Sequence, residues 1–201
     1  LNALDQQGIA DDTIIFFLSD NGGPNHKNAS DNTPLKGRKG DVWEGGFRVP
    51  FAMRWLGVLE AGKTYDKPIL SLDIFGTIAG LAEAPENPGR PLDGVNLIPF
   101  LTGAKEGDPH QAIYIRKYDE QKYVVRLKDK KLVISSRGAK PQLFDLSEDV
   151  AEAKNIASSY PEQLQNLDKM RIEWSAELQD PAFLGLTHTA DWIRRKQSKQ
   201  K

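Results

Sequence analysis

The residues best suited to chemistry are an acidic and an amide side chain that follow a short apolar run. Ile14–Leu18 is an unbroken apolar segment, which predicts a strand buried on both faces of a parallel sheet. Asp20 and Asn21 come shortly after it, and open α/β sheets bind ligands at the carboxyl ends of such strands. Their oxygens are hard donors of the kind that calcium and magnesium prefer. The competing interpretation of Asp-Asn-Gly-Gly is an ordinary turn, because Asn and Gly are typical turn residues.

A basic, glycine-rich segment lies further along the chain. Residues 36–40 read K-G-R-K-G, and residues 43–50 read W-E-G-G-F-R-V-P. Cations and glycines near an acidic strand end predict an anion site beside a metal. The alternative is a solvated basic loop. His26, in the polar stretch between the two segments, is interpreted as an exposed loop residue.

Three blocks in order carry a family resemblance: S-D-N-G-G, N-x-P-L-K-G-x-K-G and W-E-G-G-x-R-V-P. This arrangement resembles the sulfatase family, the formylglycine-dependent arylsulfatases of the alkaline-phosphatase superfamily, and the resemblance covers most of the chain. It implies that Asp20 and Asn21 ligate a calcium ion and that Lys39 contacts the sulfate group. For Glu44 and Arg48 it implies structural rather than catalytic roles.

The same resemblance predicts that the chain is the C-terminal part of a longer enzyme. Sulfatases convert a Cys or Ser in a C/S-x-P-S/A-R motif into formylglycine, and the chain has no cysteine and no serine in that motif. Residues 1–8 also read as the last turns of a helix closed by a glycine. We therefore expect the formylglycine nucleophile upstream of Leu1, in the remaining N-terminal part of the enzyme. The isolated chain is expected to be inactive.

Composition restricts the function classes only broadly. The chain has 201 residues, 39% of them hydrophobic and 27% charged, which is typical of one globular domain or parts of two. A net charge of −1 gives no reason to expect a nucleic-acid or membrane partner. No apolar run approaches the length that crosses a bilayer. The chain has no cysteine, so it forms no disulfide, and its cysteine usage does not indicate a redox compartment.

The pattern of elements predicts an α/β fold. By resemblance, residues 1–105 are the C-terminal part of the sulfatase catalytic domain, an alkaline-phosphatase-like α/β sandwich. Residues 49–55 predict a second strand of its sheet, and residues 98–101 predict a helical turn. A helix is expected from Ser71, as its N-cap, to about Glu83. Its apolar stripe is expected to pack against the sheet and contains Leu72, Phe75, Ile78, Ala79 and Ala82.

Residues 106–186 predict a small antiparallel sheet with one packed helix, and residues 187–201 a basic polar tail. The expected strands are residues 112–117, 122–127, 131–136 and 142–146. Such a meander is expected to have one solvated face that carries its charged residues. The carboxylate-rich turn that follows resembles a family signature and is interpreted as structural. Pro161 is a favourable first residue for the last helix.

The function that these features predict for the intact protein is calcium-assisted hydrolysis of a sulfate monoester by a formylglycine nucleophile. Family habit suggests a sulfated small molecule or carbohydrate as the substrate. One alternative is a phosphomonoesterase or phosphonate hydrolase of the same superfamily. Another is a non-catalytic binding module.

Overall fold

A computed structural model describes residues 1–24, 30–85, 89 and 91–183. His26 and the predicted tail at residues 187–201 lie outside these residues. The chain divides into two compact units, each made of segments that are not continuous in sequence. Residues 1–20 and 49–111 form the first, and residues 21–48 and 112–201 belong to the second. The domain boundary expected at residues 105–106 stays a prediction.

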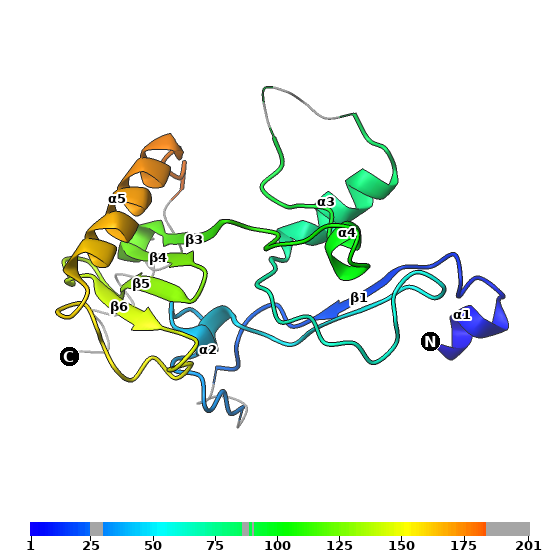
Figure 1. The fold of residues 1–201 in the computed structure, drawn as a ribbon, viewed down its shortest axis with the longest axis horizontal. Coiled ribbons are helices and arrows are strands. Elements are labelled where there is room, and N and C mark those ends of the chain that lie inside the picture. Colours follow the sequence, from blue (N-terminus) through cyan, green and yellow to red (C-terminus); the bar gives the residue numbers. More distant parts are fainter. Residues whose placement is uncertain (25–29, 86–88, 90, 184–201) are drawn as a thin grey trace, which may run out of the picture. The chain divides into compact units, whose positions relative to one another are not determined.

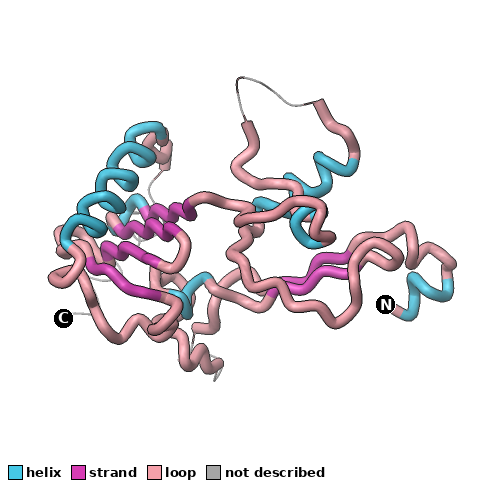
Figure 2. Tube along the Cα trace, viewed as in Figure 1, coloured by secondary structure: helices cyan, strands magenta, loops and turns pink. Residues whose placement is uncertain are grey.

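The first unit contains two short strands and three helices, joined by long irregular connections (Figure 2). They are α1 (Asn2–Gln6), β1 (Ile15–Leu18), β2 (Phe51–Arg54), α3 (Leu72–Leu81) and α4 (Ile98–Leu101). Gly8 follows α1 with φ of 68°, the left-handed conformation of a glycine that ends a helix. The predicted helix end, both strands and the turn at 98–101 are therefore confirmed.

The environment of β1 differs from the prediction. β1 pairs antiparallel with β2, with Ile15 opposite Arg54 and Leu18 opposite Phe51. Phe17 is 70% exposed, so the strand is not buried on both faces. Within the described residues β1 has a single neighbouring strand, and a two-stranded ladder does not cover its own faces. An apolar run indicates the surroundings that a strand requires, but neither its partner nor that partner's direction.

Helix α3 also turns its side chains differently from the prediction. Leu72, Phe75 and Ile78 are exposed, Phe75 at 64%. The buried positions are Asp73, Gly76 and Thr77, which face the backbone of residues 94–97. The expected packing of the apolar stripe against a sheet is therefore wrong for this structure. The polar side is buried because its oxygens accept backbone N–H groups of that loop, at 2.9 Å for Asp73 and 3.1 Å for Thr77.

The start of α3 shows a second difference. Ser71 occupies the N-cap position, but its side chain makes no capping hydrogen bond within the described part of the chain. The carboxylate of Asp73, in the first turn, instead accepts the N–H of Leu70, which precedes the helix, at 2.6 Å. The same carboxylate lies 2.9 Å from Nε2 of His110. Asp73 therefore joins the helix start to two other segments of the first unit.

The second unit is built on a four-stranded antiparallel meander with strand order β3-β4-β5-β6 (Figure 1). Its elements are α2 (Glu44–Phe47), β3 (Ala112–Lys117), a short 3-10 helix (Tyr118–Glu120), β4 (Lys122–Leu127), β5 (Lys130–Ile134), β6 (Gln142–Asp145) and α5 (Pro161–Glu177). These bounds confirm the four predicted strands and the helix that begins at Pro161. None of the described helices is both long and apolar enough to cross a membrane.

Both faces of this sheet are covered. Successive residues of a strand point to opposite faces, so Val124 and Val125 enter different clusters. On one face α5 packs through Leu167, which is fully buried against Val125, Leu132 and Leu143. On the other face the segment around α2 packs through Val42, Trp43 and Phe47 against Val124, Val133 and Phe144. The predicted solvated face is therefore wrong, because a segment distant in sequence covers it.

The packing of α5 gives a stability prediction. Leu167→Ala should lower the free energy of unfolding by about 2–5 kcal/mol, because it leaves a cavity between helix and sheet. Ile172→Ala, on the exposed side of the same helix, should change it by less than about 0.5 kcal/mol. Urea unfolding followed by circular dichroism measures both. Equal losses in the two variants would contradict the packing described for α5.

Candidate functional site

The candidate site begins at the turn that follows β1. Asp20 is exposed, while Asn21 is partly buried and donates from Nδ2 to the carbonyl of Gly22 at 3.1 Å. An amide binds a cation through its carbonyl oxygen, because its nitrogen is only a donor. Among the described residues, no group of three or more His, Cys, Asp or Glu side chains forms a metal cluster. The donor types of Asp20 and Asn21 fit calcium, which needs further oxygen ligands besides these two.

The glycines after Asn21 permit a close approach between two segments of the second unit. The N–H of Gly22 donates to the carbonyl of Gly46 at 3.0 Å. A Cβ on Gly22 would lie 1.7 Å from the carbonyl oxygen of Gly45, and one on Gly46 would lie 2.3 Å from that of Asp41. Neither Gly22 nor Gly46 has a positive φ, so both are needed for space rather than for a sharp turn. The two Gly-Gly pairs of the sequence therefore meet in the structure.

Asn32 connects this turn to the basic segment. Its Oδ1 accepts the N–H of Gly23 at 2.9 Å, and its Nδ2 donates to the carbonyls of Gly23 at 2.9 Å and Gly37 at 3.1 Å. Sequence reasoning assigned it no role. The signal was present, because Asn32 is the first residue of the block N-x-P-L-K-G.

Lys39 lies beside the turn through its backbone and has an exposed side chain. Its N–H donates to the carbonyl of Gly23 at 3.3 Å, two residues after Asn21. The preceding residue is held by a turn in which the N–H of Asp41 donates to the carbonyl of Arg38 at 2.8 Å. The structure therefore places a candidate metal ligand and a candidate anion contact on neighbouring backbone segments.

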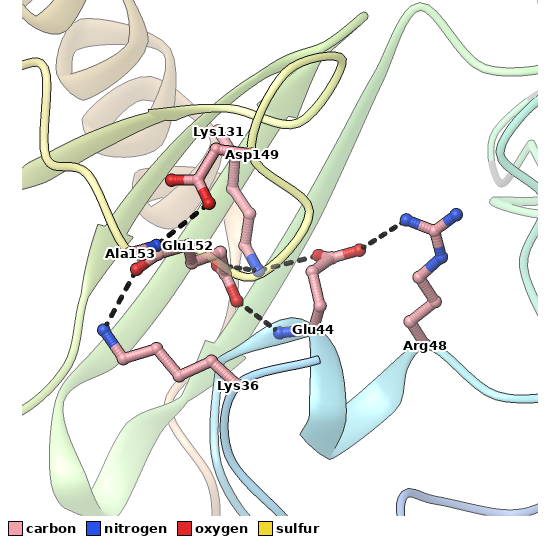
Figure 3. Close-up of polar contacts among 7 residues, drawn as sticks. All are labelled: Lys36, Glu44, Arg48, Lys131, Asp149, Glu152 and Ala153. Atoms are coloured by element: carbon pink, nitrogen blue, oxygen red, sulfur yellow. Dashed lines mark hydrogen bonds and ion pairs between the residues drawn. The ribbon is translucent and has the colours of Figure 1, made fainter. Parts of the chain in front are cut away.

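A buried ionic cluster lies where α2 packs on the sheet (Figure 3). The side chain of Lys131 on β5 is 0% exposed, that of Glu152 is 0% and that of Glu44 on α2 is 1%. Nζ of Lys131 lies 2.7 Å from Oε1 of Glu44 and 2.7 Å from Oε1 of Glu152. The first contact is a hydrogen bond, whereas Glu152 Oε1 has no partner in hydrogen-bond geometry. The second contact is therefore an ion pair by distance alone.

The cluster has two carboxylates around one buried cation, and a second cation lies at its outer side. Arg48 is half exposed, and its guanidinium lies 3.5 Å from Oε2 of Glu44. Burial raises the pKa of Glu152 above its usual 4.5, although the charge of Lys131 opposes this shift. Because the folded pKa exceeds the unfolded one, this carboxyl favours folding most below about pH 4.5. That contribution is lost as the pH rises through the folded pKa.

Lys36 adds a second link to Glu152. Its Nζ lies 3.7 Å from the centre of the Trp43 ring and donates to the backbone carbonyl of Glu152 at 3.2 Å. The Trp43 ring in turn packs edge-on against Phe144 of β6. Lys36 thus joins the basic segment to the sheet. The sequence did not indicate this cluster, because the charges of the meander were assigned to a solvated face, whereas Glu44 and the turn after the last strand were interpreted as structural.

Comparisons of sequence and of structure both relate this chain to known proteins. Residues 1–84 match the family model described as Sulfatase. The human protein named Steryl-sulfatase is 40% identical over 121 residues, which covers 57% of this chain and 21% of that protein. The solved structure titled "Ps i-CgsB in complex with k-i-k-neocarrahexaose" is 30% identical, with a TM-score of 0.84, and covers 97% of this chain and 44% of that one.

A further solved structure contains a named substrate. Its title describes a complex "with its substrate D-Glucosamine-2-N, 6-O-disulfate". That protein is 23% identical with a TM-score of 0.70, and the match covers 88% of this chain and 36% of that one. The chain spans about a fifth of the length of the first curated relatives that it matches.

The buried cluster gives a second stability prediction. Lys131→Met should lower the free energy of unfolding by about 3–5 kcal/mol, because it leaves Glu44 and Glu152 buried without their cation. Lys140→Met removes an exposed lysine and is the matched control, expected to change it by less than about 0.5 kcal/mol. Urea unfolding at neutral pH measures both variants. A Lys131→Met protein as stable as the control would mean that the cluster contributes nothing to folding.

Proposed function

Because the chain belongs to the sulfatase family of the alkaline-phosphatase superfamily, we propose that the intact protein hydrolyses a sulfate monoester. The single observation that carries this proposal to residues is the hydrogen bond between Lys39 and Gly23, which brings a cation next to the turn of Asn21. The substrate we propose is a sulfated carbohydrate. A structural neighbour that is 30% identical to this chain was solved in complex with k-i-k-neocarrahexaose, and this supports that choice.

Asp20 and Asn21 are proposed to hold a calcium ion together with ligands from outside this chain. Their carboxylate and amide oxygens suit calcium, which takes about six to eight oxygen ligands. When bound, the ion would supply positive charge that orients the sulfate oxygens and withdraws charge from them. The nucleophile in this proposal is a formylglycine that the chain does not contain.

Lys39 is proposed to bind the sulfate oxygens through its exposed ammonium group. A sulfate monoester carries one negative charge, and further charge develops on the leaving oxygen as the S–O bond breaks. A cation fixed beside that oxygen interacts more strongly with the transition state than with the bound substrate, and therefore raises the rate. The backbone bond to Gly23 and the turn at Arg38–Asp41 hold the segment before substrate binds. Little reorganisation is then needed during the reaction.

The metal role of Asp20 predicts weaker calcium binding in one variant. Asp20→Ala in the intact protein should lower the affinity for calcium at least tenfold, because it removes an anionic ligand. Isothermal titration calorimetry with calcium measures this without relying on activity. Asp12→Ala removes an exposed carboxylate elsewhere in the first unit and is the control. Equal calcium affinity in wild type and Asp20→Ala would rule out the ligand role.

The proposed sulfate contact predicts a rate effect. Lys39→Ala in the intact enzyme should lower kcat/KM about a hundredfold to a thousandfold, the usual cost of one lost charge-stabilising contact. Lys39→Arg should restore only part of this, because a planar guanidinium has a different reach. Arg38→Ala, the adjacent cation, should lose much less. Steady-state hydrolysis of an aryl sulfate compares the three variants. If Lys39→Ala has nearly wild-type activity and Arg38→Ala has lost most of it, then Arg38 rather than Lys39 makes the sulfate contact and the proposal is wrong.

A further inference from the structure

We propose that Glu152 is a positioning residue that holds the loop of residues 36–44 in place and so acts on hydrolysis through Lys39. The inference rests on the proposed function of Lys39. All the residues that carry it belong to the second unit. Glu152 lies on the turn after β6 and is more than a hundred positions from the loop in sequence, yet it contacts both ends of it.

The first end of the loop is held by the backbone of Glu152. Its carbonyl accepts a hydrogen bond from Nζ of Lys36 at 3.2 Å, three residues before Lys39. The cation is fixed from a second direction, because it lies over the Trp43 ring. A lysine side chain held by a carbonyl and an aromatic face loses much of its rotational freedom.

The second end of the loop is held by the side chain of Glu152. Its Oε2 accepts the backbone N–H of Glu44 at 2.7 Å, five residues after Lys39. Lys131 lies between the carboxylates of Glu44 and Glu152 and keeps both charged groups together inside the unit. In Figure 3 these side chains converge between α2 and the strands of the sheet. Glu152 therefore contacts one end of the loop with its backbone and the other end with its carboxylate.

The loop itself is closed, so a displacement at its ends reaches Lys39. The N–H of Gly45 donates to the carbonyl of Lys36 at 2.7 Å and joins the two ends directly. Between them, the Arg38–Asp41 turn and the Lys39–Gly23 bond leave few free torsions. A cation misplaced by about 1 Å can lose roughly a hundredfold in rate, because catalytic contacts depend steeply on geometry.

The turn that carries Glu152 is itself fixed. Glu152 has φ of 53°, a left-handed conformation that is uncommon for residues other than glycine. The carboxylate of Asp149 accepts the N–H groups of Ala153 at 3.1 Å and Lys154 at 2.8 Å, and it holds the chain in this conformation. A backbone kept in a strained conformation by its surroundings is typical of a position with a specific task. Here the conformation aims a carbonyl and a carboxylate at one loop.

A double-mutant cycle on the intact enzyme tests the proposal. Glu152→Gly removes the carboxylate, and glycine tolerates the positive φ at this position. Alone it should lower kcat/KM about tenfold to a hundredfold. In the Lys39→Ala background it should lower kcat/KM by less than about threefold, because two residues that act through one contact are not additive. An equal loss in both backgrounds would mean that Glu152 acts on the enzyme generally, and the proposal would be overturned.

Two controls keep the test decisive. Glu148→Gly makes the same substitution at an exposed position of the same turn, and its kcat/KM should equal that of wild type. Lys36→Met removes the ammonium group that binds the Glu152 carbonyl and lies over the Trp43 ring, while the side chain keeps a similar length. It therefore tests the other end of the loop if Glu152→Gly does not fold. The same non-additivity with Lys39→Ala is expected.

A readout independent of activity separates this inference from the proposed function. In Glu152→Gly the amide of Asp41 should exchange at least tenfold faster with deuterium, whereas the amides of β4 should keep their protection. Unchanged exchange at Asp41 would refute the positioning role. If Lys39→Ala retains full activity, the proposed function of Lys39 is wrong, and the exchange rates still decide whether Glu152 holds the loop.

Discussion

The second unit depends on one buried cation. Lys131 points from β5 into the interface between the sheet and the α2 segment, where it lies within 2.7 Å of the carboxylates of Glu44 and Glu152. A lysine in this place costs desolvation energy that only close, opposite charges offset. These charges come from a short helix and a turn that are far from the strand in sequence. The Lys39 loop lies between two points on this cluster.

The close contact of the glycines complements the ionic cluster. The ionic cluster joins α2 to β5 and to the turn of Glu152, whereas the missing side chains of Gly22, Gly45 and Gly46 let neighbouring backbone segments approach closely. Asn32 then binds the turn of Gly23 and the carbonyl of Gly37 with one amide group. The result is a short-range network of backbone hydrogen bonds around an exposed lysine. Hydrogen-bond networks whose members have partners restrict the motion of the backbone.

Local structure was predictable from the sequence, whereas the surroundings of each element were not. Short runs of apolar residues separated by turns predicted all four strands of the meander, and Pro161 predicted the start of α5. The second face of the sheet was misjudged because α2 covers it from across the chain, and no periodicity encodes that partner. The apolar stripe of α3 was expected to be buried, but it is exposed. An apolar stripe indicates that a helix face is suited to burial, but not which surface covers it.

The candidate site shows the same limit in its charged residues. Asp20 and Asn21 were proposed from an acidic and amide pair that follows a strand, and Lys39 from the family resemblance of its block, because short motifs can be read from the sequence. Their roles stay predictions. Lys131 and Glu152 were assigned to a solvated face and a structural turn, since an isolated charge is usually exposed. Burial changes what such charges do. An exposed charge contributes little to stability. A buried charge restricts its neighbours to few geometries, because leaving it unpaired is costly. The backbone of an exposed lysine such as Lys39 can therefore keep a defined position while its side chain stays accessible to an anionic ligand.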